Sequence, residues 1–98
     1  MNKKEIFTTI VSIVSDVTDI SPEEILSSSH REDIVDARHL LVHFLHTYGG
    51  LYIAQIAPMT GFSTRHVAFI LSSFDTRLRS RRLLRNNYDI IKLKLSHN

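Results

Sequence analysis

The sequence predicts an all-α fold, a compact bundle of about five to six helices that contains a helix-turn-helix. Few segments alternate between apolar and polar residues with the period of two that is typical of a half-buried strand. Only 3 glycines and 2 prolines occur among the 98 residues, so little interrupts regular structure. Apolar residues instead recur at helical spacing over most of the chain. These three observations together favour helices throughout.

Length and composition predict one domain, residues 1–98. A chain of this length buries about two thirds of its unfolded surface, which is enough for one core. There is no cysteine, which excludes disulfides and thiolate–zinc sites. The longest apolar stretch, residues 6–17, is interrupted by polar residues and is too short for a membrane span or a signal peptide. We therefore expect a cytoplasmic protein without a membrane partner.

The first predicted helix covers about residues 3–18. Many of its apolar residues are β-branched and are only moderate helix formers, so this helix depends on packing. A short helix follows, in which Ser21 is the expected N-cap, Pro22 suits the first helical position and Glu24 can close a capping box with Ser21. The apolar face of the first helix consists of Ile6, Phe7, Ile10, Val11, Ile13, Val14 and Val17.

The next predicted helix covers about residues 32–48, and Gly49 and Gly50 end it with left-handed backbone angles. Helices over about residues 52–58, 64–79 and 81–95 follow. Core residues recur at helical spacing in these segments: Ile34, Ala37, Leu41, Phe44, Leu45 and Tyr48, then Val67, Ile70, Leu71, Phe74 and Leu78, and finally Leu84, Tyr88, Ile91 and Leu95.

Residues 52–79 have the pattern of a helix-turn-helix. Two helices that cross at a tight angle need a small residue at their closest approach, and Ala57 is that residue. Four positions later, Gly61 provides the left-handed backbone angle of the turn, and Ser63 is a natural N-cap for the second helix. Pro58 is the exception, because it removes a backbone donor and is expected to kink the first helix or end it early.

In such a motif the second helix enters the major groove of DNA by its N-terminal turns. Thr64, Arg65 and Ala68 are expected to point outward there, with His66 and Phe69 near the rim. Arg65 is the main candidate for base readout, because a guanidinium can bond both acceptors of a guanine edge. Phe69 is expected to pack in the core or in an interface. Since such folds also serve as packing modules, an interpretation without DNA stays open.

Charge is distributed unevenly along the chain. Residues 1–62 have four basic against eight acidic side chains, a net charge of −4, whereas residues 63–98 have eight basic against two acidic ones, a net charge of +6. An anionic partner is therefore expected at the C-terminal half, unless the arginines between 77 and 85 only form a solvated helix face.

From about residue 10 to residue 95, the chain resembles the C-terminal DNA-binding domain of the bacterial chromosomal replication initiator DnaA. The stretches that carry the resemblance are ISPEEI at residues 20–25, IVDARH at residues 34–39 and the predicted helix-turn-helix. The resemblance implies a Trp-repressor-like helical fold, double-stranded DNA as the partner and a role in replication initiation.

Two residues of the long helix are assigned through this resemblance. Arg38 matches an arginine that contacts the DNA backbone, and His39 stands where glutamine is usual. The family's loop before this helix is rich in lysine and arginine, but here it is SSSHRED at residues 27–33, in which Arg31 remains as a phosphate partner. At the recognition helix, STRH at residues 63–66 replaces the family's aspartate-histidine-threonine-threonine signature.

No other constellation indicates chemistry. His39, His43 and His46 share one helix face, but they lack a carboxylate at a matching position, so a solvated face is the favoured interpretation over a metal site. No arrangement of serine, histidine and acid predicts nucleophilic catalysis. We therefore expect no enzyme activity, no cofactor, no metal and no small-molecule substrate.

The sequence predicts a sequence-specific DNA-binding protein with regulatory or accessory roles, whose affinity falls steeply with salt. The alternative is a protein-interaction module that keeps the fold but has lost DNA binding, with the first and last helices forming a homodimer or partner surface. Under the DNA hypothesis we expect Arg38, Arg65 and Arg77 on one exposed face. The candidate DNA-binding residues are Arg31, Arg38, His39, Ser63, Thr64, Arg65, His66, Arg77 and Arg79.

Overall fold

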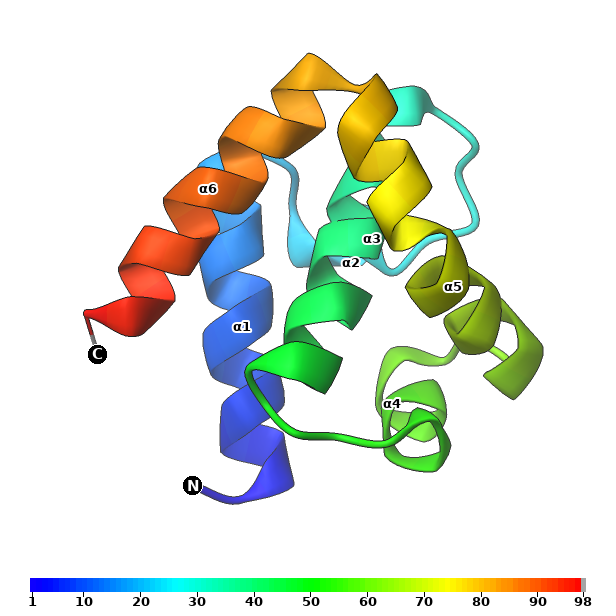
Figure 1. Ribbon diagram of the computed structural model, residues 1–98. Coiled ribbons are helices and arrows are strands. Elements are labelled where there is room, and N and C mark those ends of the chain that lie inside the picture. Colours follow the sequence, from blue (N-terminus) through cyan, green and yellow to red (C-terminus); the bar gives the residue numbers. More distant parts are fainter. Residues whose placement is uncertain (98) are drawn as a thin grey trace.

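The computed structural model describes residues 1–97 of the chain. Six helices and no strand occur in this part, which confirms the all-α prediction (Figure 1). The helices are α1 (Lys3–Thr18), α2 (Pro22–Ile25), α3 (Glu32–Thr47), α4 (Ile53–Thr60), α5 (Thr64–Ser80) and α6 (Arg82–Ser96).

Helix α3 is the centre of the bundle. It packs against each of the five other helices, with α1 and α6 on one side and α4 and α5 on the other (Figure 1). Ten of its residues are buried, so it is apolar around much of its circumference. The expected core of α3, α5 and α6 is confirmed for the most part, although Tyr48 is 48% exposed.

The cap expected at α2 forms only in part. Ser21 accepts a hydrogen bond from the backbone N–H of Glu24 at 3.2 Å, and Pro22 occupies the first turn as predicted. The predicted capping box also needs a hydrogen bond from the Ser21 backbone N–H to the Glu24 carboxylate, and this part of the prediction is wrong. The carboxylate instead accepts from the Ser21 hydroxyl at 3.4 Å. A loop over residues 26–31 then leads into α3.

Two glycines form the turn after α3, but only Gly50 has the left-handed backbone angle that was predicted for both. Gly50 has a left-handed φ of 69°, which an L side chain adopts only with strain. A Cβ atom on Gly49 would lie 2.6 Å from the Leu45 carbonyl oxygen and 2.7 Å from Ile6 Cγ2. Gly49 therefore permits α1 to approach the end of α3.

Helix α4 extends past Pro58 to Thr60, so the predicted end of this helix at residue 58 is wrong. A proline at position 58 leaves the carbonyl of Ala54, four residues earlier, without its helical donor. Both residues are exposed, so water can bond to this carbonyl and the helix tolerates the proline. Ala57 is buried, and Gly61 ends the helix with a φ of 81° and a hydrogen bond from its N–H to the Ala57 oxygen at 2.9 Å.

No helix within residues 1–97 is long and apolar enough to cross a membrane.

Candidate nucleic-acid interface

The first two turns of α5 expose one face to solvent. Thr64, Arg65 and Ala68 lie on this face, as the sequence predicts, while Val67 and Ile70 point into the core with no exposed surface. Ser63 caps the helix by accepting a hydrogen bond from the His66 N–H at 3.0 Å. Packing on one side and the cap at the end therefore hold the exposed side chains in a defined orientation.

Phe69 also belongs to this exposed face. Its side chain is 60% exposed, so the core alternative predicted for this residue is wrong, while packing in an interface stays a prediction. The physical reason is angular, because the core stripe of α5 passes through Val67, Ile70 and Phe74 and turns residue 69 away from the core.

A groove separates the start of α5 from the loop before α3. Phe62, Ser63, His66 and Phe69 form one wall. The other wall and the floor come from the loop and from α3, and consist of Leu26, Ser27, Ser28, His30, Val35, Arg38 and His39. The groove therefore brings together four of the candidate DNA-binding residues: Arg38, His39, Ser63 and His66.

Arg38 lies inside the molecule, with only 5% of its surface exposed. Its guanidinium donates hydrogen bonds to the carbonyl oxygens of Ile25 at 3.2 Å, Ser27 at 2.6 Å and Ser29 at 3.1 Å. Burial lowers the pKa of Arg38 from its usual value. These bonds fold the loop around the guanidinium, so Arg38 shapes the groove wall and has little surface left for a ligand.

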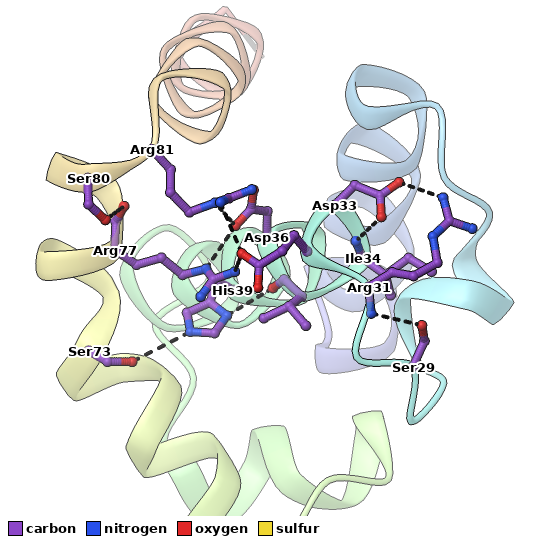
Figure 2. A network of polar contacts seen from close by, with 12 residues as sticks. Ser29, Arg31, Asp33, Ile34, Asp36, His39, Ser73, Arg77, Ser80 and Arg81 are labelled. Carbon is purple, nitrogen blue, oxygen red and sulfur yellow. Dashed lines mark hydrogen bonds and ion pairs between the residues drawn. The ribbon is translucent and has the colours of Figure 1, made fainter.

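Two of the three histidines of the groove, His39 and His66, differ in burial. His39 is 4% exposed, its Nδ1 lies 2.9 Å from the Val35 oxygen, and its Nε2 lies 3.5 Å from Ser73 Oγ (Figure 2). His66 is half-buried, and its ring centroid lies 5.0 Å from that of Phe62. Burial lowers the pKa of both rings, and the nearby Arg38 charge lowers that of His66 further.

Arg77 and Arg81 bind two carboxylates of α3 (Figure 2). Asp36, whose side chain is 8% exposed, accepts from Arg77 Nε at 2.8 Å and from Arg81 Nε and Nη2, also at 2.8 Å in each case. One oxygen of Glu32 accepts from Arg77 Nη2 at 3.1 Å and from Arg81 Nη1 at 3.0 Å. The carboxylates raise the pKa of Arg81. Arg77 is therefore part of an internal ion-pair network that joins α3 to α5 and α6.

This network was not predicted, because only its acidic half follows helical spacing. Glu32 and Asp36 are four residues apart and share one side of α3. Arg77 lies in α5, but Arg81 lies between α5 and α6 with an extended backbone, so the position of the second arginine depends on the turn between these helices.

The three arginines expected on one exposed face are not brought together. Arg65 is exposed, Arg38 is buried, and Arg77 is held in the ion-pair network. Arg31 is exposed and pairs with Asp33 at 2.9 Å, while Arg79 is exposed near the far end of α5. Arg65 is thus the one member of the expected trio that faces solvent.

The solvated face that the spacing of the α3 histidines favoured is confirmed only for His46, which is exposed and whose Nδ1 lies 2.8 Å from the Leu51 oxygen. His39 is buried, and His43 stacks on Phe74 with ring centroids 3.9 Å apart and planes 11° apart. For these two residues the interpretation is wrong, because α5 and α6 cover α3 on this side. Within residues 1–97 no group of three or more histidine, cysteine or acidic side chains is placed to hold a metal ion.

Comparisons with known proteins find a chromosomal replication initiator that contains a similar segment. No family model and no solved structure matches the chain. The chromosomal replication initiator protein DnaA of Kosmotoga olearia is 38% identical to it over 63 residues. The matched region covers 64% of this chain and 14% of that relative, so the chain corresponds to a small part of the initiator's length.

Proposed function

We propose that the chain binds double-stranded DNA through a Trp-repressor-like helix-turn-helix formed by α4 and α5, and that it has no enzyme activity. The observation that carries this proposal is the exposed N-terminal face of α5, which the Ser63 cap and the left-handed turn at Gly61 hold in place. In this arrangement the first turns of α5 enter the major groove. The similarity to part of a chromosomal replication initiator supports a replication-initiator-like or regulatory role.

The candidate residues have different tasks in this arrangement. Arg65 reads a guanine edge, and Thr64 contacts a phosphate or a thymine methyl group. Ser63 and His66 line the groove of the protein between α5 and the loop before α3, and a DNA backbone can follow the loop side of this groove. Arg38 acts indirectly by holding that loop, His39 through its contact with Ser73 of α5, and Arg77 by joining α5 to α3.

Two further arginines are peripheral to the proposed interface. Arg79 shares the exposed side of α5 with Arg65 but lies 14 residues further on, which corresponds to about 21 Å along the helix. Arg31 can contact a phosphate only if its ion pair with Asp33 breaks. With few free cations near the start of α5, we expect a modest salt dependence of binding rather than the steep one that the sequence alone predicts.

A titration of the protein against fluorescent duplexes tests the proposal. We expect binding to random-sequence and initiator-box duplexes at about 50 mM salt that weakens at about 200 mM, because phosphate contacts release counterions. Arg65→Ala should weaken binding to the preferred duplex by about 1–3 kcal/mol, the usual contribution of a bidentate arginine–guanine contact.

Arg82→Ala is the matched control, because Arg82 is exposed at the start of α6 and its removal changes the net charge equally. Equal losses of affinity in Arg65→Ala and Arg82→Ala would show that binding depends on net charge and not on a contact between Arg65 and a base. No binding at about 50 mM salt would refute the DNA proposal, since this concentration favours phosphate contacts.

A second candidate function is protein interaction through α6. Leu83, Ile90 and Leu93 are 62%, 44% and 60% exposed on this helix, whereas Leu84, Ile91 and Leu95 form its core face. An exposed apolar stripe of this kind marks a contact surface in many proteins. Sedimentation that shows a dimer, together with its loss in Leu83→Glu, would favour this candidate if no duplex binds.

A further inference from the structure

Phe69 is a large apolar side chain on the face that the proposed function directs toward DNA. It occupies the sixth position of α5, after Thr64 and Arg65 at the first two positions. From Thr64 to Phe69 the helix rises about 7.5 Å, so Phe69 lies within the first two turns, the part of α5 that the proposed function places in the major groove. All three side chains can therefore meet base edges when the start of α5 lies in the groove.

The chemistry of the base edges leaves one suitable contact for a phenyl ring. Phe69 cannot form the hydrogen bonds that distinguish guanine, cytosine and adenine. The C5-methyl group of thymine is the apolar feature that the major groove presents. Ala68, which precedes Phe69, is also exposed and has a methyl side chain.

The charge of α5 around Phe69 is compatible with an anionic partner such as a nucleic acid. No acidic residue occurs on α5 between Thr64 and Phe74, and Arg65 stands one helical turn before Phe69, although Glu32 of α3 lines a hollow that Phe69 also lines. Residues four positions apart on a helix have Cβ atoms about 5–6 Å apart, close to two base-pair steps of about 3.4 Å. A guanine for Arg65 and a thymine for Phe69 therefore fit within about two base pairs.

We infer that Phe69 is a specificity-determining residue that contacts thymine methyl groups, so that the chain prefers duplexes with thymine beside the guanine bound by Arg65. This inference rests on the proposed DNA binding by α5. The new element is a direct contact between Phe69 and thymine methyl groups that contributes to sequence preference.

The experiment replaces thymine by deoxyuridine, which lacks only the C5-methyl group. A duplex that the protein binds is prepared in both forms and titrated by fluorescence anisotropy with the unaltered protein, Phe69→Ala and Leu83→Ala. We expect the unaltered protein to bind the deoxyuridine form about fourfold more weakly for each thymine methyl group that Phe69 touches. Phe69→Ala should lose the part of this discrimination that Phe69 provides and keep only that of a Thr64 contact with a thymine methyl group. Leu83→Ala, which removes an exposed apolar side chain of α6, should discriminate like the unaltered protein.

The outcomes separate this inference from the proposed function. Equal binding of both duplexes by the unaltered protein, or undiminished discrimination by Phe69→Ala, overturns the role of Phe69 while DNA binding stands. Absence of binding to any duplex overturns both. A dimer in sedimentation that Phe69→Ala dissociates would instead place Phe69 against a second copy of the chain. Circular dichroism checks that Phe69→Ala folds, which we expect because the ring is 60% exposed.

Discussion

Asp36 is the buried charge on which the contact between α3 and the C-terminal helices depends. Its carboxylate accepts bonds from two guanidinium groups, so its desolvation is offset by charge-assisted hydrogen bonds on both oxygens. Glu32 completes the network, but its side chain is 65% exposed. We therefore expect Asp36 to contribute more to the free energy of unfolding than Glu32, although both bind the same two arginines.

Asp36→Asn should lower the free energy of unfolding by about 2–3 kcal/mol, because one partner of a mostly buried pair is removed while the arginines remain partly solvated. Urea denaturation followed by circular dichroism measures this loss. Glu32→Gln is the matched control and should cost less than about 1 kcal/mol, the range of exposed ion pairs. Equal losses in both variants would contradict the ranking of the two carboxylates.

At the scale of elements, local signals predicted helix starts and turns better than helix ends. The Ser21 and Ser63 caps and the turns at Gly50 and Gly61 were all predicted, because each depends on residues within one or two helical turns. The end of α4 was not predicted correctly, because whether the helix can contain Pro58 depends on which side of the helix faces water. Burial of that kind is a tertiary property.

Gly61→Ala should destabilise the fold by about 1–2 kcal/mol, the cost of a left-handed backbone for a residue with a Cβ atom. No atom lies within 4 Å of the place that this Cβ would occupy, so conformation and not a clash causes the loss. Gly61→Asn should cost less, because asparagine tolerates this region. Thermal or urea denaturation of both variants checks the order, and a larger loss in Gly61→Asn would contradict it.

At the scale of the whole molecule, the uneven charge of the sequence is partly cancelled by folding. Arg77 and Arg81 of the basic half pair with Glu32 and Asp36 of the acidic half, across 41 to 49 residues of chain. Charge counted along the chain therefore overestimated the cations available to DNA. The outward face of α5 was predictable from periodicity, whereas the occupation of Arg38 and Arg77 depends on long-range contacts that a single sequence does not show.

The packing of α3 against α5 and α6 also predicts how stability depends on pH. His43 is enclosed by Phe74, Phe44 and Tyr88, and this burial lowers its pKa from 6.5 to about 4. The nearby Asp75 opposes the shift, while His46 and Lys92 add to it. Burial lowers the pKa of His39 as well. The folded state therefore favours neutral rings in its interior.

Stability should fall as the pH is lowered from 6.5 to about 4, because over this range the unfolded chain binds a proton at residue 43 that the folded chain excludes. Below about 4 the folded state is protonated at His43 too, so this residue causes no further change of stability with pH. His43→Phe keeps a ring against Phe74 but cannot titrate, so its free energy of unfolding should depend less steeply on pH over the same range. Urea denaturation at several pH values measures both slopes, and an NMR titration of the His43 ring gives its pKa directly. Equal slopes in both proteins would show that His43 does not link protonation to unfolding.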